Sequence, residues 1–522
     1  MSCHGNSVPG VHKTSKTMPL RKRFIGAICA IACVAALLAI YVLTMAPTLT
    51  WGHNGADGGD LVLAVAHGSI PHPPGAPTYL LLGDLFIHLP WGDPAWRLNL
   101  LSAVMAAGAA GLATAAALHL LQETNDGTQV PVLAPVVLTA GLSLGLSPLL
   151  WSQALITELY ALAAFFTTLV MLLALLPSPT WLLGLVWGIS LGSHLTLLFL
   201  APLVAWRVRQ EKKGPLQQLG ATCLLALLGW GLVYGPVLLA RKHAPSPWGD
   251  VSTFASWWEL VSGRLYRNYI FGLPLIDWPQ RLLAWAGLLV RQFTPPGAVL
   301  AGLGLVHLWQ VRRPLALASA LTFGMFNIYA IGYNTTDSLV YLALALPAAA
   351  LWLGIGLALA ADWLSHWLPR AEWMSLLLPL LPRAAWKLFL RSWLPRTAWA
   401  LLLLPLLQAL LFWGQMDLHG DRSAVEWAEQ ALRQAPSQAI LLTEQDAHTF
   451  ALWYVHDVLG ERPDVSVIDI DLWGHEPYRE IALDALDLES ADSGGLSLEV
   501  ATRQTSRPVI HAASLVIVEE AP

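Results

Sequence analysis

Two aspartates in a glycine-rich segment are the residues of this sequence best suited to chemistry. Residues 51–61 read WGHNGADGGDL, with two glycines between Asp57 and Asp60. Glycines let the backbone turn sharply and approach a ligand closely. One carboxylate could act as a general base towards a hydroxyl, while the other orients an acceptor or holds a cation. A solvated Asp-Gly turn accounts for the segment equally well when it is considered alone.

A proline-rich stretch follows the aspartates and fixes a histidine. Residues 71–77 read PHPPGAP, and so many prolines make a stiff, non-helical segment. His72 is thereby held near the expected membrane surface, where it could bind a phosphate when protonated or orient an aspartate. An ordinary packing histidine is the alternative. Residues 79–89 then predict a short amphipathic helix.

Two more polar residues interrupt apolar sequence. Glu158 ends the segment WSQALITE, and His194 divides the apolar run 180–206. Both belong to the candidate substrate site. Alternatively, Glu158 complements a helix dipole and His194 makes an ordinary interhelical hydrogen bond.

Three arginines complete the candidate site. Arg241, Arg264 and Arg267 lie in residues 241–280, among several tryptophans and tyrosines. Arginine suits a phosphate because its guanidinium donates two parallel hydrogen bonds. Most of the aromatic residues are expected to be interface anchors.

The elements that must position these residues are membrane helices. Of 522 residues, 56% are apolar and 12% are charged, against roughly 25% charged in soluble domains, so most of the chain must meet lipid. Ten apolar runs approach the roughly 20 residues that cross a bilayer. They cover residues 24–45, 98–121, 131–150, 159–176, 180–206, 216–240, 295–311, 315–332, 339–361 and 397–415.

The charges decide the expected topology. With residues 21–23 in the cytoplasm, ten crossings would place the basic cluster 207–213 outside, against the positive-inside tendency. An additional break at 192–194 gives eleven crossings and puts three basic clusters inside: residues 207–213, 312–313 and 370–396. We therefore expect ten to eleven spans in a prokaryotic plasma membrane, with the amino terminus in the cytoplasm and the carboxyl-terminal part outside.

Three domains are predicted. Residues 1–23 form a cytoplasmic tail, and residues 24–415 a polytopic helical domain whose first outer loop is 46–97. Residues 421–522 are polar and acidic, with strand-like segments near 439–442 and 465–468, so we expect a small outer α/β domain.

A repeat of 13 residues precedes the last apolar run. Within residues 368–399 the pattern LPRxxW occurs three times. Basic, aromatic and leucine residues broken by proline favour short helices in the cytoplasmic headgroup layer. A partner or lipid site is the alternative.

Several classes of cofactor and partner have no support in the sequence. The four cysteines form neither a disulfide framework nor a CxxC site. A net charge of -5 is too mild to indicate nucleic acid. No cofactor is evident, and no metal site is predicted, because Asn54, Asp57 and Asp60 lack the alternate spacing of a calcium loop. A divalent metal is possible but unsupported.

The motifs taken together resemble the protein family first labelled domain of unknown function 2723, whose eukaryotic relative is the transmembrane-protein-260 type of protein O-mannosyltransferase. The resemblance spans nearly the whole chain and is most specific where the aspartates join HPPG. The matching segments are residues 51–99, 147–153, 157–162, 191–196, 247–250, 329–337, 450–454 and 462–465.

The resemblance implies the GT-C fold, a polyprenyl-phosphate-sugar donor and an active site at the extracytoplasmic membrane surface. It implies that Asp57 is the base, since Asp57 matches the first acid of the usual Asp-Ser-Gly-Glu pattern. Asp60 matches the second acid, where relatives carry the longer glutamate, and Gly58 replaces the serine.

The implied reaction is inverting transfer of a sugar, with mannose as one candidate, to a hydroxyl of a protein or a lipid. The donor phosphate would lie near His72, His194 and the arginines of 241–280, while Asp60 and Glu158 position the acceptor or the base. Two other classes stay open. A transporter or flippase predicts polar residues near mid-helix and an inverted repeat, neither of which is clear in this sequence. A non-catalytic scaffold would work through its outer α/β domain.

Overall fold

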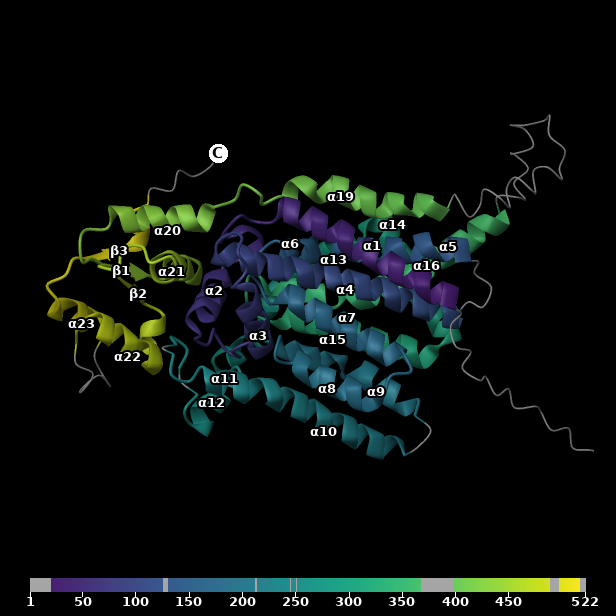
Figure 1. Ribbon diagram of the computed structural model, residues 1–522, viewed down its shortest axis with the longest axis horizontal. Coiled ribbons are helices and arrows are strands. Elements are labelled where there is room, and N and C mark those ends of the chain that lie inside the picture. The colour runs from purple at the N-terminus through teal and green to yellow at the C-terminus, as the bar shows by residue number, and fades with distance from the viewer. Residues whose placement is uncertain are drawn as a thin grey trace, which may run out of the picture.

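The protein is a bundle of helices with a small α/β domain beyond one end of it (Figure 1). The structure, a computed structural model, describes residues 20–124, 130–211, 214–244, 246–249, 251–367, 398–488 and 497–516. The basic segment 370–396 and nearly all of the 13-residue repeat lie outside these ranges.

Within the described ranges, six helical segments are long and apolar enough to cross a membrane. They are α1 (Leu20–Thr44), α4 (Pro94–Thr124), α10 (Pro215–Tyr234) with α11 (Pro236–Ala240), α15 (Arg313–Gly332), α16 (Leu346–Trp367), and η7 (Ala398–Leu402) with α19 (Leu403–Met416). A seventh candidate is α5 (Val130–Gly145) with α6 (Pro148–Ala154), which meet at a bend of 64°. The chain is an integral membrane protein.

The remaining apolar runs form helices that are too short, or not apolar enough, to be counted with these. These are α7 (Tyr160–Leu175), α8 (Thr180–Ser190), α9 (Ala201–Arg209) and α14 (Thr294–Val311). The run 180–206 breaks at 191–194, between α8 and the 3₁₀ helix η2 (Leu195–Leu200). The sequence predicted ten to eleven spans, including the break at 192–194, because hydropathy measures apolar length and does not detect where the other helices bend or stop.

Small residues allow the helices to approach closely. A Cβ at Gly304 or Gly356 would overlap the backbone of the facing helix in the pair α14 and α16. Lipid tails are as apolar as leucine, so helices in a membrane gain little from the hydrophobic effect and depend on such close packing.

The two described basic clusters lie at one end of the bundle. Arg312 pairs with Glu123 at the end of α4, and Arg207 donates to the carbonyl of Ser178 just beyond α7. The ends of α4 and α7 are adjacent, since His119 bonds the carbonyl of Leu175. This arrangement agrees with the sequence prediction that both clusters lie on the same side of the membrane.

At the opposite end lie three short helices of the connecting segments. They are α2 (Gly58–His67) and α3 (Pro77–Phe86) in the first loop, and α12 (Phe254–Val261) after α11. Two longer connections at this end carry α13 (Trp278–Gln292) and the 3₁₀ helix η5 (Ser338–Leu344).

The carboxyl-terminal domain contains a three-stranded parallel sheet of order β2-β1-β3. Its elements are α20 (Ser423–Gln434), β1 (Ile440–Thr443), α21 (Asp446–Trp453), a π-helical turn η8 (Tyr454–Val458), β2 (Ser466–Asp469), α22 (Glu476–Ala485), α23 (Leu498–Gln504) and β3 (Val509–His511). Ile440 is opposite Ser466 on one side and Val509 on the other. The sequence pattern located β1, α21 and β2 but not β3, which has three residues and no buried run.

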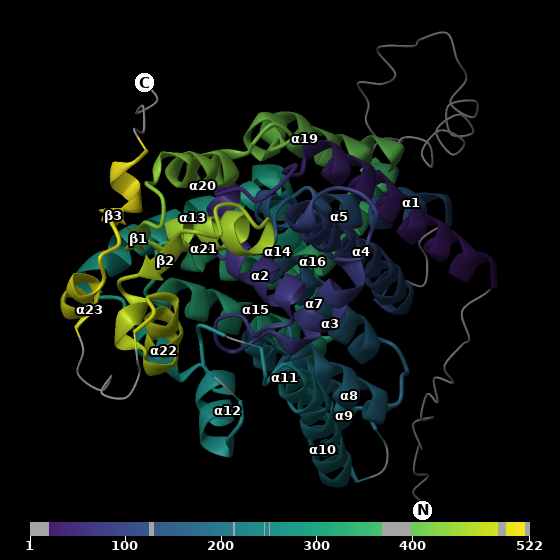
Figure 2. The ribbon, with the colours of Figure 1, turned by 60° about the vertical axis from the view of Figure 1, so that its left-hand side comes forward.

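The α/β domain rests on the end of the bundle that carries α2. Figures 1 and 2 both place α21 beside α2, and the two helices are in contact. Buried apolar residues continue from the bundle into the domain as one cluster. The first loop is therefore enclosed between the membrane helices and the α/β domain.

Candidate active site

Asp60 is the buried centre of a hydrogen-bond network. Its side chain is only 2% exposed, in the first turn of α2. One carboxylate oxygen accepts from the backbone N–H of His72 and from its ring Nδ1, both at 2.8 Å. The other accepts from the indole Nε1 of Trp248 at 2.9 Å. Asp60 therefore fixes His72 and Trp248 and does not itself face an acceptor.

Asp57 is the accessible member of the pair. It occupies the position just before α2, where its side chain makes no capping hydrogen bond. The side chain is 42% exposed, and its Oδ2 lies 3.8 Å from Nε2 of His72. Because Nδ1 of the ring is held by Asp60, the opposite nitrogen is directed at Asp57. Asp57, His72 and Asp60 thus form a line of alternating charge that runs from solvent into the core.

The neighbouring charges of Asp57, His72 and Asp60 shift the pKa values of these groups. Burial disfavours an imidazolium, but the carboxylates of Asp57 and Asp60 outweigh it and raise the pKa of His72 to about 9. The surrounding protein removes water from Asp57 and raises the pKa of its carboxyl, an effect that His72 opposes and that Asp60 and Asp337 reinforce. At neutral pH His72 is therefore a cation.

Two more acids face the same region. Glu158 is buried between α6 and α7, and its carboxylate accepts a hydrogen bond from the N–H of Leu159 at 3.3 Å. Burial and the charge of Asp57 raise the pKa of Glu158 well above its usual value. Asp337, just before η5, also acts electrostatically on Asp57 and Glu158. The sequence pattern included Asp337 only as the end of a matching motif, although an acid five residues after the apolar helix α15 was a usable signal.

His194 lies in an aromatic cluster. Its ring centroid is 5.8 Å from that of Tyr160 and 5.3 Å from that of Tyr341. Nδ1 bonds the hydroxyl of Thr196 at 2.7 Å and accepts from its N–H at 3.2 Å. The side chain thus caps η2, and this use leaves Nε2 as the nitrogen that could meet a ligand.

The three arginines of the predicted phosphate site have different surroundings. Arg241 is buried, pairs with both carboxylate oxygens of Asp84 at 2.6 and 2.7 Å, and donates to the carbonyls of Ala64 and Ser69. Those four bonds give it a structural role that ties α2, α3 and α11 together, so we remove it from the phosphate site.

Arg264 and Arg267 lie in the 3₁₀ helix η3 (Arg264–Tyr269). Arg264 pairs with Glu259 on an exposed surface, whereas Arg267 is exposed and its side chain makes no hydrogen bond or ion pair with the described residues. Between them, Tyr266 contacts the ring of His72 edge-on at 6.4 Å between centroids. Of the three arginines, Arg267 is therefore the one that is free to meet an anion.

The α/β domain completes the site. The indole of Trp51 donates to the carbonyl of Ala447 at 3.0 Å. Trp248, which bonds Asp60, packs on Phe450 at 6.2 Å between centroids. Burial and the charge of Asp57 raise the pKa of Asp446 to about 6. Sequence reasoning did not place α21 at the site, because only the folded chain brings residues almost four hundred positions apart together.

The glycines around the aspartates serve packing. Gly58 and Gly59 are helical, and the residues of segment 51–61 with a left-handed backbone are His53 and Asn54. A Cβ at Gly59 would overlap the backbone carbonyl of Phe450 in α21. The expectation that these glycines turn the chain is therefore wrong, and the close approach that they permit is to the α/β domain.

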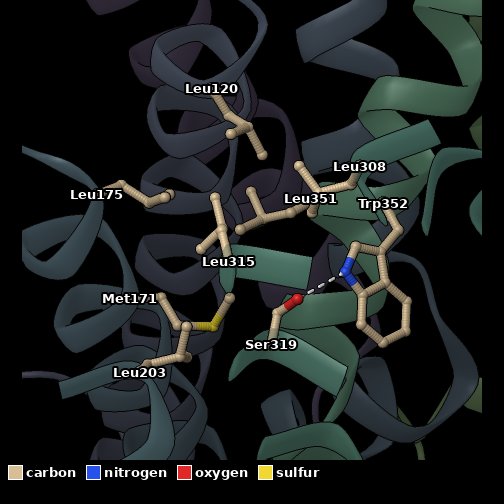
Figure 3. Close-up of a pocket in the computed structure, with 9 residues that line it drawn as sticks. All are labelled: Leu120, Met171, Leu175, Leu203, Leu308, Leu315, Ser319, Leu351 and Trp352. Atoms are coloured by element: carbon tan, nitrogen blue, oxygen red, sulfur yellow. Dashed lines mark hydrogen bonds between the residues drawn. The ribbon is translucent and has the colours of Figure 1, made fainter. Parts of the chain in front are cut away.

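An apolar recess lies at the other end of the bundle and takes no part in this site. Figure 3 shows its lining, which comes from α4, α7, α9, α14, α15 and α16. Within this lining the indole N–H of Trp352 donates a hydrogen bond to the hydroxyl of Ser319 at 3.2 Å. Within the described ranges, no group of three or more His, Cys, Asp or Glu side chains is placed so that it could hold a metal ion.

Two parts of the chain match known domain families. Residues 57–215 match the N-terminal domain of protein O-mannosyl-transferase TMEM260, and residues 424–497 match TMEM260-associated domain 2. The protein O-mannosyl-transferase TMEM260 of Mus musculus is 24% identical over 495 residues, which are 86% of this chain and 63% of the mouse protein. The chain thus spans less than two thirds of that relative. The resemblance inferred from the sequence motifs is confirmed.

The fold is similar to that of ArnT from Cupriavidus metallidurans. The crystal structure bound to undecaprenyl phosphate has a TM-score of 0.54 at 13% identity, covering 84% of this chain and 89% of ArnT. The apo structure has a TM-score of 0.50 at 13% identity, with coverages of 87% and 94%. At this identity the likeness concerns the fold alone, and it confirms the predicted GT-C-type helical bundle with a small carboxyl-terminal α/β domain.

Proposed function

Because the chain carries the N-terminal domain and associated domain 2 of the TMEM260 family, we propose that it is an integral-membrane glycosyltransferase with Asp57 as its general base. The donor is a polyprenyl-phosphate-linked sugar, with mannose as the first candidate, and the acceptor is a hydroxyl of a protein or a lipid. The name of the mouse relative supports mannose, and undecaprenyl phosphate bound to ArnT supports the lipid donor. The end of the bundle that carries Asp57 faces the extracytoplasmic side.

The observation that carries the proposal is the accessible carboxylate of Asp57 beside a buried Asp60–His72 pair. A general base must reach the proton that it removes, and Asp57 is the aspartate of the pair that can do so. Asp60 acts through His72 as a positioning residue.

The reaction follows from this arrangement. Asp57 takes the proton of the acceptor hydroxyl as the hydroxyl oxygen attacks the anomeric carbon. The bond from that carbon to the phosphate oxygen breaks, and the prenyl phosphate leaves with the electron pair, so the anomeric configuration inverts. The His72 imidazolium, 3.8 Å from Asp57, opposes the rise in the pKa of this carboxyl and offers positive charge to the phosphate. Arg267 supplies a second positive charge at the mouth of the site.

The test uses purified protein in liposomes with radiolabelled prenyl-phosphate mannose and two acceptors, a pool of serine- and threonine-containing peptides and a hydroxylated lipid. Asp57→Asn is expected to lower kcat by about 10²- to 10⁴-fold while leaving donor binding unchanged, since a general base contributes about that much. Asp277→Asn, in an exposed turn before α13, is the matched control. Unimpaired transfer by Asp57→Asn would remove Asp57 from this role, and translocation of the labelled lipid without any transfer would favour a flippase.

A further inference from the structure

The connection between α11 and α14 exposes large apolar side chains along most of its length. We call residues 254–283 of this connection the strap; it contains α12, η3, the 3₁₀ turn η4 (Leu275–Asp277) and the start of α13. Leu275 and Ile276 in η4 are each 85% exposed, and Phe254 at the start of α12 is 78% exposed. Trp258, Phe271 and Leu283 are also exposed. An exposed apolar surface of this kind marks contact with another protein or with a membrane.

The strap begins level with the outer end of α10. The indole N–H of Trp257 donates to the carbonyl of Tyr234, the last residue of α10, at 3.1 Å. The ring centroid of Trp257 lies 5.7 Å from that of Trp230, one turn further into α10, and 5.7 Å from that of Phe254. Figures 1 and 2 both place α12 beside α11, which continues α10. The exposed ring of Phe254 therefore extends the surface of a membrane-spanning helix.

The strap then reaches the outer end of α15. The backbone N–H of Asn334, just beyond α15, donates to the carbonyl of Tyr269 at 2.9 Å. A Cβ at Gly332, the last residue of α15, would overlap the ring of Phe271. Leu232 in α10 and Ile328 in α15 are exposed in the turns next to these contacts. The apolar side of the strap thus joins the lipid-facing surfaces of two membrane-spanning helices.

The inner side of the strap touches the catalytic loop. A Cβ at Gly75, three residues after His72, would lie 3.0 Å from a terminal methyl carbon of Leu260 in α12, so Leu260 packs directly on this turn. Tyr266 in η3 contacts the ring of His72 edge-on. The strap therefore contacts the catalytic loop on one side and exposes apolar side chains on the other.

Lipid is the cover that these observations favour. The exposed side chains continue the lipid-facing surfaces of α10 and α15 without a break, whereas a protein partner would have to bind across the boundary between lipid and water. Tryptophans such as Trp257 and Trp258 are enriched where a membrane meets water. The polar groups of the strap include the exposed pair of Glu259 and Arg264, as expected for helices that lie in the membrane interface with an apolar and a charged face.

We propose that the strap lies in the headgroup and acyl boundary of the membrane on the side of the catalytic loop, and that lipid beneath it holds Leu260 and Tyr266 against that loop. The membrane contact does not depend on the reaction. The positioning of the catalytic loop rests on the proposed glycosyltransferase function.

The first experiment measures where the strap lies. An environment-sensitive fluorophore is attached to Ile276→Cys in the full-length protein with its four cysteines replaced by alanine, in phosphatidylcholine liposomes that contain a spin-labelled lipid as quencher. Leu232→Cys in α10 is the membrane control, and Glu461→Cys on the exposed surface of the α/β domain is the water control. Quenching at Ile276 should match that at Leu232 and exceed that at Glu461 several-fold.

Quenching no stronger than that at Glu461 would overturn the membrane contact. A decrease in quenching at Ile276 as the protein-to-lipid ratio rises would overturn it too, because a second copy of the chain would then cover the strap.

The second experiment measures the consequence for catalysis. Leu275→Asp combined with Ile276→Asp places two charges where lipid is expected, and charged side chains leave a lipid environment. This variant should lower kcat/KM for the donor by up to about 10²-fold, the loss that a displacement of about 1 Å can cause. Its thermal unfolding should not change, since both side chains are exposed. Leu459→Asp, at an exposed leucine of the α/β domain, is the matched control and should keep full transfer.

Transfer by the double variant equal to that of Leu459→Asp would overturn the positioning role of the strap. If the wild-type protein transfers no sugar at all, the glycosyltransferase proposal fails, whereas the quenching experiment still decides whether the strap lies in the membrane.

Discussion

At the scale of single residues, two aspartates three positions apart have opposite environments. Asp57 precedes α2 and reaches solvent, while Asp60 points into the core and accepts three hydrogen bonds. A buried carboxylate is tolerated only when it is paired and bonded, which Asp60 is. Sequence spacing cannot distinguish the two residues, because the difference depends on Trp248 and His72, which come from other segments.

The first prediction concerns the pH dependence of transfer and His72. In wild type, kcat/KM should rise with pH as Asp57 loses its proton, and it should fall near pH 9 as His72 loses the charge that assists the phosphate. His72→Gln should abolish the alkaline fall. It should also move the acid limb to higher pH, because the imidazolium lowers the pKa of Asp57 and would then be missing.

The control is His67→Gln at the exposed end of α2, which should keep both limbs of the profile. The measurement is kcat/KM between about pH 3.5 and pH 10 in the same liposomes, a range that brackets the usual carboxyl and imidazole pKa values. If the fall in kcat/KM at alkaline pH persists in His72→Gln, a group other than His72 causes it.

At the scale of elements, the fold was predictable where composition decides it. Long apolar runs located the helices, and the alternation of charge placed two basic clusters at one end of the bundle. The bend between α5 and α6 and the short strand β3 were not predictable, since neither leaves a periodic signal in the sequence. For the site, the roles given to the first loop and to His72 stay predictions, whereas Arg241 is paired with Asp84, a partner that its place in the sequence does not reveal.

The second prediction concerns the contact between α2 and α21. Gly59→Ala places a methyl group on the carbonyl of Phe450, which is backbone and cannot move aside without shifting α21. We expect Gly59→Ala to lower the thermal stability and to reduce transfer strongly, because α21 positions Trp248 and Trp51 around the aspartates.

Gly58→Ala is the matched control in the same turn. Its new Cβ would lie 2.9 Å from a terminal methyl carbon of Leu49, a flexible side chain that can yield. Differential scanning fluorimetry and the transfer assay should therefore show a smaller loss in Gly58→Ala than in Gly59→Ala. Equal losses would mean that the contact with Phe450 is not what requires glycine.

At the scale of the whole molecule, the site is assembled from distant parts of the chain. The first loop supplies the carboxylates, the segment after α11 supplies Trp248 and Tyr266, and the α/β domain supplies Phe450 and Asp446. Counting the membrane crossings between these parts could predict that they lie on the same side of the membrane. It could not predict that they touch, which requires the continuous apolar core that joins the bundle to the domain.

The third prediction follows from that shared core. A protease site inserted between His419 and Gly420, an exposed position in the connection from α19 to α20, allows the α/β domain to be cut from the bundle. Cutting a linker removes the effective concentration that it supplies, so only an interface with substantial affinity of its own keeps the parts together. The cut leaves the contacts between the two parts in place: the Thr50–Asp421 hydrogen bond, the Trp51–Ala447 hydrogen bond and the buried apolar cluster. The domain should therefore co-elute with the bundle in size-exclusion chromatography, and sugar transfer should continue. The same cut in Gly59→Ala should release the domain and end transfer, whereas release from the otherwise unaltered protein would show that the linker alone holds the site together.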